Sequence, residues 1–270
     1  MFNKPTTPIV LTIAGSDCSG GAGIQADIKT ISVTGSYACS VITALTAQNT
    51  HGVTSVRSVP AEFVAQQLDT VFSDLNVVAV KVGMLSNEDI IHAVAEQLKA
   101  YKPSFLVVDP VMVATSGDTL LENKAVDALK KTLLPLATLI TPNLPEAVVL
   151  TNATLPTNED EMRSMADALR LSGARNTLLK GGHLKGDESS TDLLITPERV
   201  FRYSAKRHLT KNTHGTGCTL SSAIASYLAQ GHTLERSVSM AKHYITKAIA
   251  HSGELAVGTG SGPVHHFYTD

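Results

Sequence analysis

Cysteine is scarce in this sequence, and the few cysteines are not paired. There are three, Cys18, Cys39 and Cys218, with no C-x-x-C spacing among them. An odd number of isolated cysteines argues against a disulfide framework and against a zinc site built from thiolates. The ten histidines offer no replacement, because no two lie four residues apart on a stretch of helical period. We therefore expect free thiols and no histidine metal centre.

Long apolar runs and one-sided charge are also missing. The longest early apolar run, Ile9 to Ala14, is too short for a secretion signal or a membrane-spanning helix, so we expect a cytoplasmic protein. The net charge is −2 and there is no basic cluster, whereas a nucleic-acid or anionic-membrane partner requires one. These absences leave a small molecule as the expected ligand.

The chain has no low-complexity segment, long linker or internal repeat, so we expect a single domain over residues 1–270. Short β-branched runs alternate with longer segments of helical period, which is typical of βαβ units. The predicted strands are Val10–Ala14, Ser40–Thr46, Val78–Val82, Phe105–Asp109, Thr138–Thr141 and Asn176–Lys180, followed by a hairpin of Asp192–Ile195 and Val200–Tyr203. The predicted helices are Ala61–Ser73, Asn87–Tyr101, Lys124–Leu134, Asn158–Ser172, Cys218–Ala229 and Leu234–His251. The fold class is α/β, with a mostly parallel central sheet and helices on both faces.

Ligands of open α/β sheets bind beyond the carboxyl ends of the strands, so the loops there should carry the chemistry. The unusual residues do follow the predicted strands, at 15–23, Gln48-Asn49-Thr50, Gly83-Met84, Asp109-Pro110-Val111, 142–146 and 181–183. We therefore expect these loops to form one site.

The segment 212–218, Asn-Thr-His-Gly-Thr-Gly-Cys, is the most informative motif. Gly215 and Gly217 allow several backbone amides to converge on one anion, and the helix behind them adds its positive end. Cys218 lies where these donors point, so we expect its thiol pKa to be lowered. An anion pocket beside a base suits phosphoryl transfer to an alcohol. Taken alone, the segment fits equally well a glycine cap before a helix with a buried structural cysteine.

Two other glycine patterns are weaker. Residues 21–26 fit G-x-G-x-x-A between a strand and a helix, but no Asp or Glu follows between Asp27 and Glu62 to hold a ribose. We interpret this loop as a wall of the substrate pocket, with Asp27 facing the ligand. A P-loop is absent, since Asp187 stands where its lysine belongs.

Ordered motifs run from near residue 10 to the tail at 262–266. They lie at 14–27, 41–50, 81–85, 109–112, 141–147, 180–183 and 213–218. Together they resemble the ribokinase-like superfamily and, within it, the hydroxymethylpyrimidine kinase/phosphomethylpyrimidine kinase family of thiamine biosynthesis. The resemblance implies a single-domain ribokinase-like sandwich and a homodimer. It also implies an ATP- and Mg²⁺-dependent kinase that phosphorylates 4-amino-5-hydroxymethyl-2-methylpyrimidine and then its monophosphate.

The resemblance also assigns roles to residues. Cys218 matches the position of the superfamily's aspartate base, and Gly215, Thr216 and Gly217 form the catalytic anion pocket with it. The substrate pocket is implied at Gly15, Asp27, Gln48, Met84 and Val111. Gln48 suits an aminopyrimidine because a carboxamide both donates and accepts, although a strand-end amide often caps its own backbone instead.

The phosphate side is implied at Asn143, Lys180 and Thr213, and a buried lysine needs an anion. Glu146 and Asp109 would hold Mg²⁺, mainly through water, although such loop carboxylates are ordinarily just solvated. One departure concerns the flap 111–117, where Thr115 stands in place of a lysine found in some family members. The resemblance therefore supports the first phosphorylation more directly than the second.

Three alternatives remain open. A pyridoxal/pyridoxine kinase shares the glycine-cysteine pocket, although Gln48 and the first loop favour the pyrimidine. A thiol transferase or hydrolase would use Cys218 with His214 as a nucleophilic pair. A sensor would bind the pyrimidine without turnover, against which the intact Glu146, Lys180 and Cys218 argue.

Overall fold

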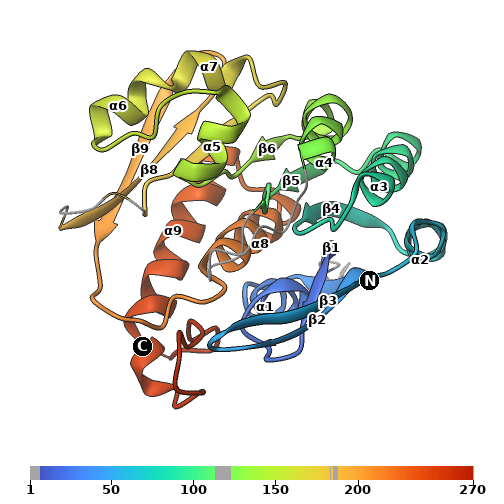
Figure 1. The fold of residues 1–270 in the computed structure, drawn as a ribbon, viewed down its shortest axis with the longest axis horizontal. Coiled ribbons are helices and arrows are strands. Elements are labelled where there is room, and N and C mark those ends of the chain that lie inside the picture. The colour runs from blue at the N-terminus through green and yellow to red at the C-terminus, as the bar shows by residue number, and fades with distance from the viewer. Residues whose placement is uncertain (1–6, 113–122, 183, 185–187, 270) are drawn as a thin grey trace, which may run out of the picture.

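A nine-stranded sheet runs through the protein in the order β3-β2-β1-β4-β5-β6-β7-β8-β9 (Figure 1). The structure is a computed structural model that describes residues 7–112, 123–182, 184 and 188–269. The strands are β1 (Ile9–Asp17), β2 (Tyr37–Asn49), β3 (Gly52–Ser58), β4 (Val77–Val82), β5 (Phe105–Val108), β6 (Leu139–Ile140), β7 (Thr177–Lys180), β8 (Ser189–Ile195) and β9 (Val200–Lys206). The strands from β2 to β7 in this order pair in parallel, whereas β3, β8 and β9 pair antiparallel. The predicted α/β class with a mostly parallel sheet is confirmed.

Helices cover both faces of the sheet (Figure 1). One layer consists of α1 (Gly23–Val33), α8 (Thr216–Ala229) and α9 (Leu234–Ala250). The other consists of α2 (Ala61–Asp74), α3 (Glu88–Tyr101), α4 (Asn123–Ala128), α5 (Leu144–Thr151), α6 (Glu159–Ser164) and α7 (Ala166–Arg170). Short helical turns lie at η1 (Leu129–Leu133), η2 (Leu134–Leu136) and η3 (Ser252–Glu254). None of the helices in the described ranges is long and apolar enough to cross a membrane.

Alternation along the strands explains the two layers. Val10 and Val107 are buried in the core beneath α8 and α9, whereas the next residues, Leu11 and Val108, are buried in the core beneath α2 and α3. Successive side chains of a strand point to opposite faces, so continuous apolar strands are buried on both sides. Because β2, β1, β4, β5, β6 and β7 pair in parallel, they all end at one edge of the sheet, where the loops that follow them meet.

The predicted strands all correspond to observed ones, but several elements differ from the prediction. β3 was not predicted, because its Ser, Thr and Arg residues lie at the exposed sheet edge and show no apolar alternation. Pairing with β3 extends β2 to Asn49, so Gln48 lies in a strand and not in the loop after it. The pairing register shifts between Ala47 and Gln48.

Differences among the helices have equally local causes. α5 was not predicted because Pro142 and Pro145 suggested a loop, yet Pro145 lies in the first turn, where a missing N–H costs nothing. The helix predicted over 158–172 is divided into α6 and α7 at Met165. The one predicted over 124–134 passes from α4 into the π-helical turn η1.

Candidate active site

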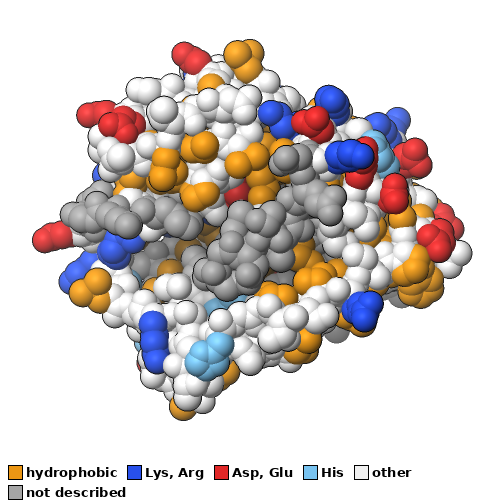
Figure 2. All heavy atoms as spheres, viewed as in Figure 1, with side chains coloured by type: hydrophobic (Ala, Val, Ile, Leu, Met, Phe, Trp, Pro, Cys, Tyr) orange, Lys and Arg blue, Asp and Glu red, His pale blue; other side chains and the backbone are white. Residues whose placement is uncertain are grey.

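A cavity of about 650 Å³ opens where the parallel strands end and α8 begins. Figure 2 shows a hollow in the middle of the viewed face, with apolar side chains along its upper edge. All of the predicted site residues except Asp27 line the cavity: Gly15, Gln48, Met84, Asp109, Val111, Asn143, Glu146, Lys180, Thr213, Gly215, Thr216, Gly217 and Cys218. The loops that the sequence placed after separate strands thus meet at one site. The flap residue Thr115 lies outside the described residues.

The turn before α8 is shaped by glycine. Gly215 has φ +81°, and a Cβ there would lie 1.9 Å from the Gly21 carbonyl oxygen, so the two glycine-rich loops touch through their backbones. The first turn of an α-helix leaves its amides without helical acceptors. Here the Thr216 N–H donates to the Thr213 carbonyl at 3.2 Å, and the amides of Gly217 and Cys218 follow it in the first turn. Gly215 is thus the residue that allows a cluster of free N–H donors to face the cavity.

Cys218 is in the first turn of α8 and lines the cavity. Burial raises the pKa of its thiol to about 11, against the opposing effect of the Lys81 ammonium. The predicted lowering of this pKa is therefore wrong for the ligand-free protein. Removal from water outweighs the positive charges nearby.

Asp109 and Lys180 form an ion pair beside the turn before α8. Lys180 Nζ lies 2.8 Å from Asp109 Oδ1, which also accepts a hydrogen bond from Thr141 Oγ1 at 3.0 Å. A Cβ on Gly217 would lie 3.3 Å from both Asp109 Oδ2 and Lys180 Nζ. The pair therefore packs against the first turn of α8, and a side chain at position 217 would press on both charged groups.

Glu146 is buried at the start of α5, with 4% of its surface exposed. Its carboxylate accepts the Asn143 backbone N–H at 2.8 Å, while the Asn143 side-chain oxygen accepts the Glu146 N–H at 2.9 Å, which forms a capping box. Burial raises the pKa of Glu146 to about 7, Lys180 lowers it and Asp109 raises it. No three His, Cys, Asp or Glu side chains in the described ranges are grouped to hold a metal ion by themselves. Any Mg²⁺ here would need phosphate oxygens and water as further ligands.

The side of the cavity that the sequence analysis assigned to the substrate contains Gly15 and Met84. A Cβ on Gly15 would lie 2.5 Å from Met84 Cε, so glycine is what admits the methionine side chain. Thr43 Oγ1 donates to the Met84 carbonyl at 2.7 Å and fixes the backbone of that loop. Met84 and Val111 give the cavity an apolar wall, as a flat heteroaromatic ring requires.

The prediction that Asp27 faces the ligand is wrong. Its carboxylate is fully buried and accepts two bonds from Lys81 Nζ, at 2.9 and 2.8 Å. It also accepts the hydroxyls of Thr12 and Ser222, each at 2.6 Å. These four hydrogen bonds satisfy both oxygens of the buried carboxylate, so it is not available to contact a ligand. The sequence signal for this pair was a lysine, Lys81, within an apolar strand.

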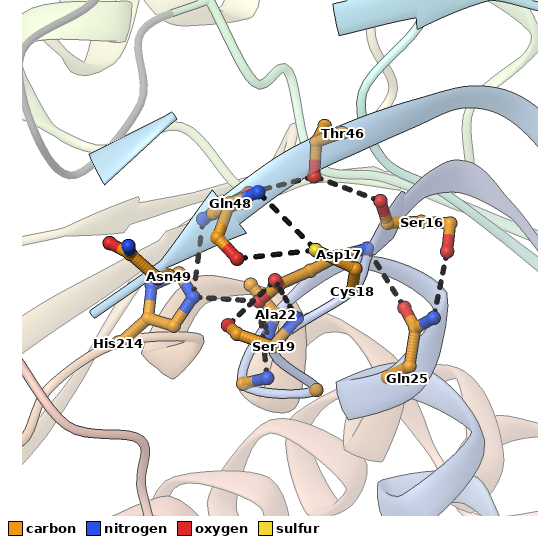
Figure 3. Close-up of polar contacts among 12 residues, drawn as sticks. Ser16, Asp17, Cys18, Ser19, Ala22, Gln25, Thr46, Gln48, Asn49 and His214 are labelled. Carbon is orange, nitrogen blue, oxygen red and sulfur yellow. Dashed lines mark hydrogen bonds and ion pairs between the residues drawn. The ribbon is translucent and has the colours of Figure 1, made fainter. Parts of the chain in front are cut away.

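Gln48 lies among polar residues that the sequence did not single out for this purpose (Figure 3). Its side-chain Oε1 lies 3.1 Å from Thr46 Oγ1, and its Nε2 lies 3.3 Å from His214 Nε2. The Cys18 thiol lies against its backbone, 3.2 Å from the carbonyl oxygen and 3.3 Å from the nitrogen. His214 Nε2 in turn lies 2.8 Å from Asp17 Oδ2. His214 Nε2 thus faces Asp17 and Gln48, which weighs against a nucleophilic pair of His214 with Cys218.

A further part of the cavity lies beside α9 and the sheet. Leu220, Ile245 and Ile249 give it an apolar surface, and Lys242 Nζ contacts Asp192 Oδ2 at 2.7 Å. The prediction had assigned none of these residues, because in sequence they look like ordinary core and salt-bridge positions. The cavity therefore has a polar end at α8 and an apolar extension.

Comparisons with known proteins agree on one family. The family model described as phosphomethylpyrimidine kinase matches residues 17–265. A hydroxymethylpyrimidine/phosphomethylpyrimidine kinase of Rhizobium meliloti is 54% identical, over 97% of this chain and 98% of the relative.

Solved structures extend the likeness to three dimensions. The phosphomethylpyrimidine kinase of Clostridium difficile 630 superposes with a TM-score of 0.80 at 46% identity, covering 90% of this chain and all of that one. An ADP complex of Bacillus subtilis pyridoxal kinase has a TM-score of 0.89 at 35% identity, covering 97% of this chain and 98% of that one.

Proposed function

This chain belongs to the phosphomethylpyrimidine kinase family, and on that basis we propose that it phosphorylates 4-amino-5-hydroxymethyl-2-methylpyrimidine and then its monophosphate, for thiamine biosynthesis. ATP is the proposed donor. The observation that carries the proposal is the meeting of Gln48, Cys218 and the Lys180–Asp109 pair around one cavity. These groups provide what transfer to an alcohol requires, namely an oriented acceptor, a proton acceptor and charge compensation.

The proposed reaction forms a bond between the substrate oxygen and the γ-phosphorus while the bond to the leaving ADP breaks. The hydroxyl proton passes to the sulfur of Cys218 in its thiolate form, which the raised pKa makes the minor form at neutral pH. The amides of Gly217 and Cys218, with Lys180, hold the charge on the transferring group. Because the transition state is loose, positioning and charge stabilisation supply most of the rate.

Mg²⁺ fits the donor set beside this turn. Glu146 and Asp109 offer carboxylate oxygens, and burial, with the neighbouring Asp109 charge, raises the pKa of Glu146 in the absence of a cation. Carboxylates with water and phosphate oxygens are the ligands that Mg²⁺ prefers. We propose that these two residues hold Mg²⁺ mainly through water, and that the bound ion neutralises charge on the phosphates. Asn143 and Thr213, which line the same end, are proposed to contact phosphate oxygens.

A second candidate is a pyridoxal kinase. The likeness to the Bacillus subtilis pyridoxal kinase over nearly the whole chain favours it. Pyridoxal also presents an alcohol on a six-membered heteroaromatic ring, so the same cavity suits it.

We also propose a single domain, because one sheet continues through all the described strands. A homodimer in the cytoplasm is proposed as the form of the protein. Exposed apolar side chains at Tyr37, Leu45 and Val56, on β2 and β3, support an association surface.

The deciding experiment follows products by mass spectrometry after incubation with ATP, Mg²⁺ and either the hydroxymethylpyrimidine or pyridoxal. The expected result is the pyrimidine monophosphate followed by the diphosphate. Monophosphate alone would limit the proposal to the first step, and phosphorylation of pyridoxal alone would transfer it to the second candidate. A covalent adduct on Cys218 would instead indicate thiol catalysis, and binding without product would indicate a sensor.

A further inference from the structure

Asp17 is an acceptor with every neighbour donating to it (Figure 3). Its Oδ1 accepts the backbone N–H and the hydroxyl of Ser19 at 2.8 and 2.7 Å. Its Oδ2 accepts the amides of Gly21 and Ala22 at 3.1 and 2.9 Å and lies 2.8 Å from His214 Nε2. Burial acts to raise the pKa of Asp17, but the bonds from His214 and Ser19 outweigh it, and the pKa is lowered. A carboxylate cannot donate, so His214 Nε2 carries a proton.

The position of that proton decides the orientation of the Gln48 amide. His214 Nε2–H donates to Asp17, so His214 Nε2 has no lone pair with which to accept a hydrogen bond. One end of the Gln48 carboxamide lies 3.3 Å from His214 Nε2, and only an acceptor is favourable there. An NH₂ group there would oppose donor to donor, so the carbonyl oxygen belongs on the His214 side. The two ends of a carboxamide have the same shape, and their hydrogen-bond partners decide between them.

Thr46 is satisfied by the same orientation. Its hydroxyl oxygen lies 2.9 Å from the Ser16 carbonyl and 3.1 Å from the other end of the Gln48 amide, and its single proton can be donated to only one of them. With the carboxamide oxygen on the His214 side, the NH₂ group lies on the Thr46 side and donates to the Thr46 oxygen, while the Thr46 proton is donated to the Ser16 carbonyl. One arrangement thus satisfies both neighbours, and the Cys18 thiol holds the Gln48 backbone in place.

The amide keeps one free lone pair and one free N–H, and Gln48 lines the cavity. We propose that His214, held by Asp17, is a positioning residue that sets substrate specificity by fixing the Gln48 carboxamide with its oxygen on the His214 side and its NH₂ on the Thr46 side. The inference rests on the proposed function, since it concerns how the same pocket reads an aminopyrimidine. The exocyclic amine then pairs with the oxygen and the adjacent ring nitrogen pairs with the NH₂ group. A 4-oxo ring, which reverses donor and acceptor, meets two mismatches.

The test compares the 4-amino ring with its 4-oxo analogue by calorimetry without ATP, so that binding selectivity is measured apart from turnover. The variants are His214→Leu, which removes the donor, and His214→Gln, whose NH₂ can still donate to both Asp17 and the Gln48 oxygen. Thr46→Val removes the second neighbour that orients the amide. Circular dichroism establishes that each variant is folded.

Two mismatched hydrogen bonds correspond to roughly a hundredfold preference of the wild-type protein for the amino ring. We expect His214→Leu to reduce this preference to about tenfold or less, because the amide can then rotate and pair with either ring. His214→Gln should stay within about threefold of the wild-type preference, and Thr46→Val should reduce it. In turnover assays, the KM for the pyrimidine should rise in His214→Leu while the KM for ATP stays unchanged.

An unchanged preference in His214→Leu would overturn the inference, as would equal weakening of both rings with a raised KM for ATP. If His214→Leu does not fold, an unchanged preference in Thr46→Val overturns it in the same way. A wild-type protein that prefers the amino ring but forms no phosphorylated product would refute the proposed function and leave this inference standing.

Discussion

Cys218 and Cys39 have thiols of similar acidity in very different places. Burial raises both pKa values to about 11, but only Cys218 lines the cavity and has the Lys81 charge near it. A raised pKa by itself therefore does not identify the base. The proposed role of Cys218 is supported by its position in the first turn of α8, at the cavity.

Replacement of Cys218 by alanine tests this assignment. We expect Cys218→Ala to bind both substrates normally and to lose roughly a hundredfold or more in kcat, the usual contribution of a general base. The wild-type kcat should rise between pH 7 and 9 as more thiolate forms, whereas the profile of the variant should be flat. Cys39→Ala is the matched control and should retain full turnover. Normal turnover in Cys218→Ala would refute the role of the thiol.

The raised pKa of Glu146 predicts that Mg²⁺ activation depends on pH. Its pKa of about 7 lies above the ordinary value of 4.5 because of burial, so protons compete with the cation as the pH falls below 7. The apparent Mg²⁺ affinity should fall by up to about tenfold per pH unit on the acid side of pH 7. Activation curves between pH 5.5 and 8.5 measure this effect. In Glu146→Gln the affinity should be weak and independent of pH, and a wild-type affinity that is constant over this range would contradict the prediction.

The same carboxyl affects stability with the opposite sign. Between pH 4.5 and 7 the folded protein holds a proton on Glu146 that the unfolded chain has released, so without Mg²⁺ its contribution to stability is lost as the pH rises.

At the scale of elements, the turn before α8 depends on the backbone of Gly215. Gly215 and Gly231, on either side of α8, both have positive φ, +81° and +88°. A Cβ on Gly231 would meet nothing within 4 Å, but one on Gly215 would strike the Gly21 carbonyl oxygen. A comparison of substitutions at these two glycines therefore distinguishes the cost of backbone strain from the cost of a steric clash.

We expect Gly231→Ala to lower the free energy of unfolding by about 1 kcal/mol, the cost of a left-handed alanine, with activity retained. Gly215→Ala should cost about 2 kcal/mol or more, because the loops at 21 and 215 must also separate. It should also lose most turnover as the free amides of α8 move. Urea unfolding and kcat on the same samples provide the comparison. Equal losses in the two variants would show that the contact with Gly21 does not matter.

At the scale of the whole molecule, one buried ion pair joins four elements. Asp27 on α1 accepts hydrogen bonds from Thr12 on β1, Lys81 on β4 and Ser222 on α8. Lys81 and Asp27 have no exposed surface. The pair thus connects the sheet to the helices that carry the site.

Lys81→Met should lower the free energy of unfolding by about 3–5 kcal/mol, because it leaves a buried carboxylate without its counter-charge. Adding Asp27→Asn should recover part of this loss, since the uncharged amide can accept from one of the two hydroxyls of Thr12 and Ser222 and donate to the other. Lys131→Met is the control: Lys131 is exposed and 3.9 Å from Asp127, so its loss should cost less than about 1 kcal/mol. Denaturant titrations measure all three, and a small effect in Lys81→Met would mean that water reaches Asp27.

Sequence reasoning succeeded where chemistry follows from chain order. Gly15, Asp109 and Glu146 were placed at one site because parallel strands bring their following loops to a common edge. Sequence reasoning failed where the outcome depends on the direction in which a side chain points. Asp27 follows a glycine motif, but the turn of α1 directs it into the core toward Lys81. The prediction for the pKa of Cys218 was wrong for a similar reason, since the direction of the shift depends on how much water surrounds the thiol.

The sequence by itself determined the fold class, the family motifs and the order of the parallel strands along the chain, because strand periodicity and glycine turns are properties of local segments. Only the tertiary structure decided which polar groups pair across the chain. Asp17, Gln48 and His214 are up to 197 residues apart in sequence, and no local pattern specifies which of them donates. Their hydrogen bonds form because the β2–β3 hairpin and the two glycine-rich loops close on one another, and that packing fixes the direction of each proton.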